Sequence, residues 1–354
     1  MICLQHGAAR RRLSGSGTLI LVAFGLGCLA LTGCELDSGG GGRPLGAQVD
    51  FNIHMQSLRQ NQRWRAMLVE QGHQEFLAQI PNQESGAASI NSLLLAAAVD
   101  KAVVLSMASA WGAGTMIAPD QVQALMLAEN DFVAAECAKF PDRLIPFFSV
   151  NPLLAWTQSE IIRCIDELQM QGMTMNFKDS EVSLKNPAHL QKVQAVLAYA
   201  DVRRLRVILE FGNGHPDFGP ADANILIQNI LFLHPNLKLQ IAHLGSDGGY
   251  NDRKAAVFDA FIAAYLDQPA QSRAELFFDM SGVVLTEAKR GTPATDKLLF
   301  PRISAQIQAW GADNIRWGSD YWQADTPQAA LANFADNIEL SSDDYITIVE
   351  HNWP

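Results

Sequence analysis

Cysteine is scarce in this sequence, and none of its five cysteines stands in a CxxC pair or a Cys/His cluster. A structural zinc site is therefore not expected. Cys3 and Cys28 fall in or before an amino-terminal apolar segment, and only Cys137 and Cys164 follow residue 34. These two could form a disulfide in an oxidising compartment. Both lie in helix-like stretches, however, so two buried thiols are at least as good an interpretation.

Basic runs are missing once the first twelve residues are passed. The chain carries 26 Lys and Arg against 37 Asp and Glu, a net charge of −11. Three arginines, Arg10 to Arg12, precede the apolar segment, and without them 23 basic side chains face 37 acidic ones, a charge of −14. A chain this acidic, with no basic stretch, is not expected to bind nucleic acid.

The sequence also lacks a GxGxxG or P-loop after its first predicted strand, and no internal repeat is visible. What recurs is a short β-branched or apolar run that ends in polar residues and precedes a helix-like stretch. Eight such runs occur, at 48–54, 101–107, 143–150, 173–178, 206–212, 237–243, 276–282 and 314–320. This alternation predicts an α/β fold, a single-domain (β/α)8 TIM barrel over residues 47–354. An open doubly wound sheet is the main alternative.

Local signals place several helices. Asn186-Pro187 and Thr326-Pro327 each combine a capping side chain with a proline suited to the first turn, and Ser341 with Asp344 is a further cap signal. The stretch 55–100 is long for one connection, so we expect an extra helical cap above the barrel mouth.

The amino-terminal residues predict export. The apolar run 18–31 is shorter than the roughly 20 residues that a membrane-spanning helix needs, and it follows a basic segment, as in a secretory signal peptide. Leu31-Thr32-Gly33-Cys34 resembles the bacterial lipoprotein box, which implies a signal peptide over 1–33 and lipidation of Cys34. An ordinary secreted protein is the alternative. Residues 34–46 are glycine-rich and predict a flexible tether. Glu35, after the cysteine, favours the periplasmic face of the outer membrane.

Polar residues end nearly all of the eight runs, and in a TIM barrel function gathers at the carboxyl ends of the strands. Asn52 and His54 share one side of the first predicted strand, so both can face the barrel axis. Imidazole and carboxylate groups form a donor set for zinc or another divalent ion, which would acidify a bound water. Asp320 could take the proton as that water attacks a carbonyl. The residues at these ends are Asn52, His54, Asn176, Lys178, Glu210, His243, Asp279, Ser281 and Asp320.

From about residue 49 onward, the chain resembles the amidohydrolase-related family of metal-dependent TIM-barrel hydrolases. The resemblance rests on RLIPFFSVNP, NPAHLQKVQAVLAYADVRRLRVIL, LQIAHLGSDGG, FFDMSGV and NIRWGSDYW. Members typically carry Asp-x-His-x-His on the first strand, histidines ending the fourth, fifth and sixth, and an aspartate after Gly-Ser on the eighth. Asp50, His54, His243 and Asp320 match this pattern.

Three positions depart from the family pattern. Asn52, Asn176 and Glu210 stand where the family has histidines on the first, fourth and fifth strands. The more anionic set that results would prefer manganese, magnesium or calcium over zinc. Alternatively no metal binds, and Glu210 is bonded to Asn52 or His54. The ligands that the resemblance implies are His54, Glu210, Asp320 and His243, with Asn52 as a weak neutral donor.

The resemblance implies an enzyme that activates water on a divalent metal and cleaves a C–N or C–O bond in a small carbonyl compound, or performs a related decarboxylation. In that reading Asp320 is the general base and His243 polarises the substrate. Asn176, Asp279 and Trp322 are the expected substrate-binding residues. The alternative is a metal-free, non-catalytic barrel lipoprotein that binds a ligand or serves as a scaffold. The partners we expect are a small-molecule substrate and a membrane, through Cys34; a homodimer is left open.

Overall fold

The computed structural model describes residues 46–70, 72–112, 117–289 and 292–351. The predicted signal peptide (1–33), with Cys34, and all of the predicted tether except Gly46 lie outside these residues. Among the residues described, no helix is long and apolar enough to cross a bilayer.

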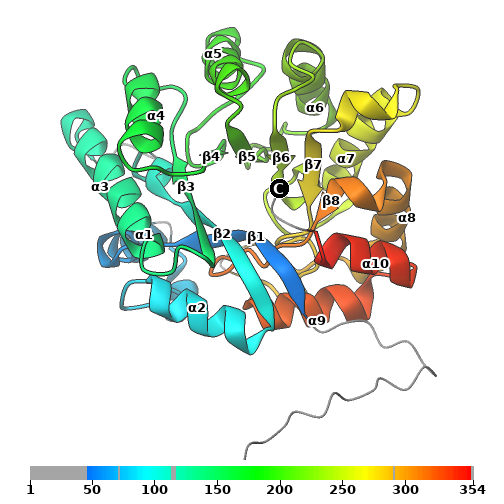
Figure 1. Cartoon of the computed structure of the whole chain (residues 1–354), viewed down its shortest axis with the longest axis horizontal. Helices are drawn as coiled ribbons and strands as arrows, with labels where there is room; N and C mark the ends of the chain where they lie inside the picture. Colours follow the sequence, from blue (N-terminus) through cyan, green and yellow to red (C-terminus); the bar gives the residue numbers. More distant parts are fainter. Residues whose placement is uncertain (1–45, 71, 113–116, 290–291, 352–354) are drawn as a thin grey trace, which may run out of the picture. The chain divides into compact units, whose positions relative to one another are not determined.

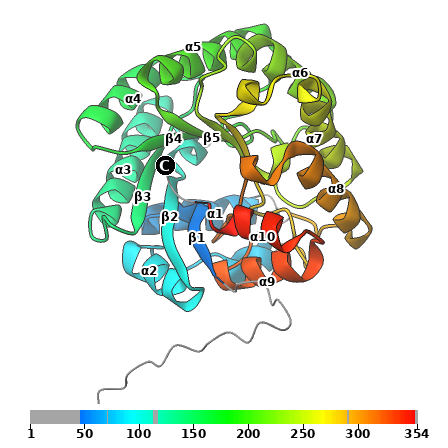
Figure 2. The same cartoon turned by 45° about the vertical axis from the view of Figure 1, so that its right-hand side comes forward.

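Eight parallel strands form one sheet in sequential order, and helices surround it (Figures 1 and 2). The chain is thus a single-domain (β/α)8 barrel, and the predicted fold is confirmed. The strands are β1 (Ala47–Met55), β2 (Val99–Ser106), β3 (Leu144–Ser149), β4 (Gly172–Asn176), β5 (Arg206–Glu210), β6 (Leu239–Ile241), β7 (Leu276–Asp279) and β8 (Ile315–Arg316).

The ring closes between β1 and the segment that follows β8. The Phe51 amide donates to the Trp317 carbonyl at 3.1 Å, and the Asp320 amide donates to the Asn52 carbonyl at 2.8 Å. These bonds bring the first and last catalytic candidates to one edge of the barrel mouth.

Ten α-helices are assigned among the described residues. They are α1 (Leu58–Glu70), α2 (Ala87–Ala96), α3 (Pro119–Cys137), α4 (Thr157–Asp166), α5 (Pro187–Arg203), α6 (Pro220–Leu226), α7 (Asp252–Tyr265), α8 (Phe300–Trp310), α9 (Pro327–Asn337) and α10 (Ser342–Val349). The predicted caps are confirmed: side chains of Asn186, Thr326 and Ser341 accept amide hydrogens at the starts of α5, α9 and α10. In the stretch 55–100, α1 and the turn that ends at Ile80, which includes a short 3-10 helix (Gln74–Gln79), line the cavity at the mouth, whereas α2 packs against β2 and α9.

A bulge in β1 decides which of its side chains face the mouth. Asp50 pairs with Ala102 and Ile53 pairs with Val104, so three steps on β1 match two on β2. Such an extra residue reverses the alternation of side chains beyond it. Phe51, on one side of the bulge, belongs to a small apolar cluster of strand residues, whereas Ile53 joins the main hydrophobic core.

Cys137 and Cys164 are both buried and unpaired. The structure therefore supports the interpretation as two buried thiols and not the interpretation as a disulfide. Burial raises the pKa of both thiols far above the usual range, so neither is a reactive thiolate.

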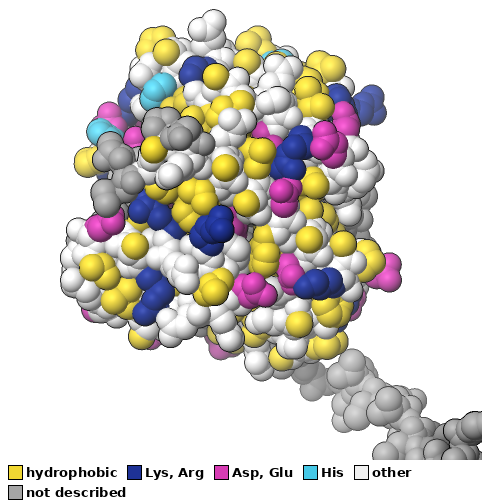
Figure 3. All heavy atoms as spheres, turned by 90° about the vertical axis from the view of Figure 1, so that its left-hand side faces the viewer, with side chains coloured by type: hydrophobic (Ala, Val, Ile, Leu, Met, Phe, Trp, Pro, Cys, Tyr) yellow, Lys and Arg dark blue, Asp and Glu magenta, His cyan; other side chains and the backbone are white. Residues whose placement is uncertain are grey.

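Figure 3 shows one face of the molecule, on which acidic, basic and apolar side chains are interspersed. No broad field of one sign covers the described residues drawn there.

Candidate functional site

His54 and Asp320 form the centre of the site. The His54 Nε2 lies 3.0 Å from Asp320 Oδ1, and both side chains are buried. The side-chain amide of Gln323 lies 3.2 Å from the same ring nitrogen. The other ring nitrogen, Nδ1, is buried and has no partner among the described residues. The predicted meeting of β1 with the end of β8 is therefore confirmed at atomic distance.

His243 has a fixed tautomer because of what surrounds its Nδ1. This nitrogen lies 2.6 Å from the carbonyl oxygen of Ser281 and 2.9 Å from the Ser281 hydroxyl. A carbonyl oxygen can only accept, so Nδ1 carries the hydrogen, and in the neutral tautomer the lone pair is on Nε2. His243 lines the cavity and can accept a hydrogen bond there.

Asp279 fixes the backbone on both sides of this contact through hydrogen bonds. Its Oδ1 accepts the backbone N–H groups of His243 and Ser281, each at 3.0 Å, and its Oδ2 accepts the Gln240 side-chain amide at 2.6 Å. Asp279 is fully buried and does not line the cavity. Asp279, expected from the sequence to bind substrate, thus lies behind the cavity lining: its oxygens accept from protein donors, and it orients His243.

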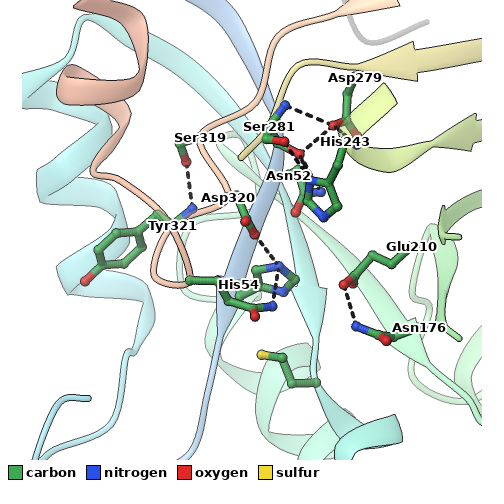
Figure 4. Close-up of polar contacts among 12 residues, drawn as sticks. Asn52, His54, Asn176, Glu210, His243, Asp279, Ser281, Ser319, Asp320 and Tyr321 are labelled. Atoms are coloured by element: carbon green, nitrogen blue, oxygen red, sulfur yellow. Dashed lines mark hydrogen bonds and ion pairs between the residues drawn. The ribbon is translucent and has the colours of Figure 1, made fainter. Parts of the chain in front are cut away.

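Asn52 is also fully buried. Its Nδ2 donates to the Ser281 hydroxyl at 3.0 Å, while its Oδ1 has no hydrogen-bond partner among the described residues. Figure 4 shows Asn52 beside Ser281 and His243. Asn52, which the sequence predicts as a weak ligand, thus lies next to Ser281, the residue that bonds His243. The side-chain carbonyl oxygen of Asn52 is a buried acceptor without a donor among the described residues.

Glu210 and Asn176 make a second pair across the mouth. They are paired residues of β5 and β4, and the Asn176 Nδ2 donates to Glu210 Oε2 (Figure 4). Burial, opposed in part by His54, raises the pKa of Glu210 to about 8. At neutral pH this carboxyl group therefore carries its proton in most molecules. The interpretation in which Glu210 is bonded to Asn52 or His54 is wrong, because its hydrogen-bond partner is Asn176.

Asp179 is a member of the site that the sequence analysis missed. It is buried, it lines the cavity, and its backbone N–H donates to the Asn176 Oδ1 at 2.8 Å. Burial raises the pKa of Asp179 to about 6, although Lys178 and His54 oppose the shift. The available signal was the carboxylate directly after Lys178, one step beyond the end of the predicted fourth strand.

The site opens into a cavity of about 400 Å³. One wall comes from α1 and the following turn, with Trp64, Leu68 and Ile80, and Trp322 meets Trp64 edge to face at 6.4 Å between ring centroids. Trp322 thus lines the cavity, as expected. The polar residues that line the cavity are Arg63, Glu70, Asn176, Lys178, Asp179, Glu181, Glu210, His243, Asp247, Thr292, Asp320 and Gln323. The aromatic wall suits a small, flat molecule, and Arg63 and Lys178 are the cations available to an acidic group on it.

Several site residues have a left-handed backbone that side chains other than glycine rarely adopt. Positive φ angles occur at His243 (56°), Leu244 (50°) and Asp320 (54°). Such conformations are held against a local penalty and cluster at functional sites. Gly282, with φ of 60°, completes the set: a Cβ there would lie 2.8 Å from Asp320 Oδ2 and 3.4 Å from His243 Nδ1.

The donor set at the mouth offers two adjacent ligands for a divalent ion. His54 and Asp320 stand 3.0 Å apart, which is about the separation of two ligands that each lie roughly 2.1 Å from one ion. His243 offers a free Nε2 in the same cavity. Among the described residues, however, no three His, Cys, Asp or Glu side chains are grouped closely enough to hold an ion as they stand. The residue types fit, and the arrangement supplies two adjacent ligands.

Comparison with known proteins adds a family and a fold. The sequence profile of the amidohydrolase family matches residues 101–352. Gamma-resorcylate decarboxylase from Rhizobium radiobacter is 24% identical over 245 residues, which cover 59% of this chain and 72% of that protein. The corresponding enzyme of Rhizobium sp. is also 24% identical, over 243 residues that cover 58% and 72% of the two chains.

Solved structures agree with the barrel. The 2,6-dihydroxybenzoate decarboxylase from Rhizobium has a TM-score of 0.56 at 14% identity, with 86% of this chain and 96% of that chain covered. The 5-carboxyvanillate decarboxylase from Novosphingobium aromaticivorans, complexed with manganese, has a TM-score of 0.57 at 14% identity, with 87% and 94% covered. The expected divalent cofactor is consistent with the ion in that relative.

Proposed function

Because the chain belongs to the amidohydrolase family, we propose that it is an enzyme that decarboxylates a small hydroxylated aromatic acid. Both curated relatives are decarboxylases. Hydrolysis of a C–N or C–O bond is the alternative reaction within the same family. The observation that carries the proposal is the placement of the buried Glu210 carboxyl group, bonded to Asn176, in one cavity with Asp320, the partner of His54.

Decarboxylation needs a proton at the carbon that loses its carboxylate. The bond from that carbon to the carboxylate breaks, carbon dioxide leaves, and the carbon takes up a proton in its place. Glu210 carries a proton at neutral pH because burial raises its pKa to about 8. A neutral acid in a largely buried site is a suitable general acid. We therefore assign proton delivery to Glu210, in place of the metal-ligand role expected from the sequence.

The remaining side chains position the substrate. Trp64 and Trp322 offer an aromatic wall for its ring, and Lys178, at the mouth, offers a cation for its carboxylate. His243 accepts a hydrogen bond from a ring hydroxyl at its free Nε2, since Nδ1 is engaged with Ser281.

A divalent ion, manganese by analogy with the solved 5-carboxyvanillate decarboxylase, would be held by His54 and Asp320. When bound it would stabilise the negative charge on the carboxylate and hydroxyl oxygens of the substrate. The two adjacent ligands at 3.0 Å support this assignment.

Lipidation at Cys34 and attachment to the periplasmic face of the outer membrane remain part of the proposal. The support is the box Leu31-Thr32-Gly33-Cys34 with the glycine-rich segment after it. Two acyl chains would make the attachment stable, whereas one would not.

The reaction is tested with a panel of ortho-hydroxybenzoic acids, with manganese added, and release of carbon dioxide as the readout. In deuterated water the product should carry deuterium at the carbon that lost the carboxylate. The Glu210→Gln variant keeps the side-chain shape, removes the proton and should lose turnover. Hydrolysis of amides, esters or lactones with no decarboxylation of any panel member would overturn the assignment.

A second candidate, a metal-free barrel that binds an acidic ligand without turning it over, is favoured by one observation. Within the described part of the chain, no group of three potential ligands is assembled to hold an ion. Tight binding of a panel acid without product, and without bound manganese, would select this candidate.

A further inference from the structure

Among the described residues, four of the five large apolar side chains that are more than 60% exposed lie on one face of the barrel. Val202 is 82% exposed, Leu266 72%, Leu233 65% and Leu95 63%. Each lies where a helix ends and leads into the next strand: Leu95 before β2, Val202 before β5, Leu233 before β6 and Leu266 before β7. In a (β/α)8 barrel all such connections lie on the amino-terminal face, opposite the mouth.

Three of these positions are neighbours around the ring, because β5, β6 and β7 are adjacent strands. Phe232, half-exposed beside Leu233, contacts the ring of Tyr265 at 5.5 Å between centroids, and Leu266 follows Tyr265 directly. We call Val202, Phe232, Leu233 and Leu266 the floor arc. Exposed Arg203 and Arg204 follow Val202 in the chain. Arg203 is paired with Asp166 at 2.9 Å, and exposed Asp267 follows Leu266, so the apolar side chains are flanked by charges of both signs, and Arg204 is the cation offered to phospholipid head groups.

The described chain begins on this same face. Ala47 is the first residue of β1, and its amide donates to the Ala98 carbonyl, just before β2, at 3.2 Å. Cys34 precedes Ala47 by thirteen positions. A glycine-rich segment of that length has a root-mean-square span of roughly 20 Å and cannot exceed about 47 Å. An anchor at Cys34 would therefore hold the floor arc close to the bilayer, at an effective concentration at which a weak contact suffices.

We propose that the amino-terminal face of the barrel rests on a phospholipid surface through the floor arc, so that the mouth points away from the membrane. This inference relies on the proposed anchor at Cys34 and is independent of the proposed reaction. A water-soluble substrate would then reach the cavity without crossing the head-group region.

Leu298 provides a matched control. It is 85% exposed, and it lies in the connection from β7 to α8, on the mouth face. Single Val202→Cys, Leu266→Cys and Leu298→Cys variants of the full lipidated chain would be labelled with an environment-sensitive fluorophore. The native Cys137 and Cys164 are buried and would not compete for the label. Each protein would be added to vesicles of phosphatidylethanolamine and phosphatidylglycerol.

The expected result is a blue shift on vesicle binding at positions 202 and 266, with no shift at 298, and quenching by a bromolipid at the first two only. Flotation of the lipidated chain, with loss of flotation in Cys34→Ser, reports on the anchor separately. A chain that floats but shifts equally at all three positions, or at none, overturns the docking face and leaves the anchor intact. Failure to float overturns both. A shift that grows with protein concentration without vesicles assigns the floor arc to a second copy of the chain and overturns the lipid surface.

Discussion

His54 on β1 and Asp320 after β8 lie 266 positions apart in the sequence, yet their side chains meet at 3.0 Å. The contact exists because the barrel closes: the segment after β8 bonds the backbone of β1 at Asn52 and Phe51. The pair is buried, so removing either partner leaves the other without its charge-assisted contact.

We expect Asp320→Asn to reduce turnover by about 10²-fold or more, because the change removes an anionic ligand of the proposed ion and the charged partner of His54. The fold should survive, because the backbone bond from the Asp320 amide to Asn52 does not involve the side chain. Asp267→Asn, an exposed carboxylate on the opposite face, is the matched control and should behave as the wild type in steady-state kinetics. Equal rates in all three proteins would remove Asp320 from the reaction.

Glu210 gives the reaction a pH dependence with a defined sign. The proton donor is the neutral form, and its pKa is raised to about 8 by burial. The rate should therefore be level near neutrality and fall as the pH rises through about 8. Glu210→Gln should be slow at every pH and lose this descending limb. A rate that instead rises through the same interval would identify the ionised form as the active one.

The same carboxyl group should make the folded state less stable at high pH. Its pKa is about 8 in the folded chain and 4.5 in the reference state, so between these values the folded state binds more protons than the unfolded state. The free energy of unfolding then decreases as pH rises through this window, by up to about 1 kcal/mol per pH unit from this group. Urea unfolding at a series of pH values should show a shallower slope in Glu210→Gln than in wild type.

The sequence predicted the eight strands of the barrel, but it predicted less well where each strand ends. Eight apolar runs predict the barrel, because a buried parallel strand is recognisable from its own residues. The run 237–243 implied that His243 ends a strand, but β6 stops at Ile241 and His243 lies in a left-handed turn with φ of 56°. That turn depends on Asp279, 36 positions away, which accepts the His243 amide. A contact at that separation leaves no local pattern.

The role of Asp279 was also not predictable from the sequence around it. A polar residue at the end of the seventh run predicted substrate contact, yet every bond that the structure gives it is to a protein donor. Which side of a strand end faces the cavity is set by the register of its neighbours and by bulges such as the one in β1. Register is a property of strand pairs. The sequence of one strand therefore predicts which residue types lie at the site, but not the role of each.

Metal binding separates the two roles considered for Glu210. We expect about one manganese ion per chain by elemental analysis, lost in His54→Ala. If Glu210 delivers a proton and does not bind the ion, the affinity should be similar in Glu210→Gln and should not follow the pKa of this group. If it is a ligand, the ion must displace its proton, and affinity should rise with pH through about 8. Calorimetric titrations at pH values on both sides of this point distinguish the outcomes.

Gly282 packs directly against the two catalytic candidates, and substitution there tests whether their spacing matters. Alanine would place its Cβ 2.8 Å from Asp320 Oδ2 and 3.4 Å from His243 Nδ1, at a φ of 60° that a side chain opposes. We expect Gly282→Ala to lower stability by about 1 to 2 kcal/mol and to reduce kcat by far more than that loss of folded protein explains.

Gly219→Ala is the control, because nothing lies within 4 Å of the added Cβ and its φ of 179° is ordinary extended backbone. Thermal unfolding and kcat, measured on both variants, separate the effects. If Gly282→Ala loses stability but keeps full kcat per folded molecule, Asp320 and His243 tolerate displacement, and the fixed geometry assigned to them is not required for the reaction.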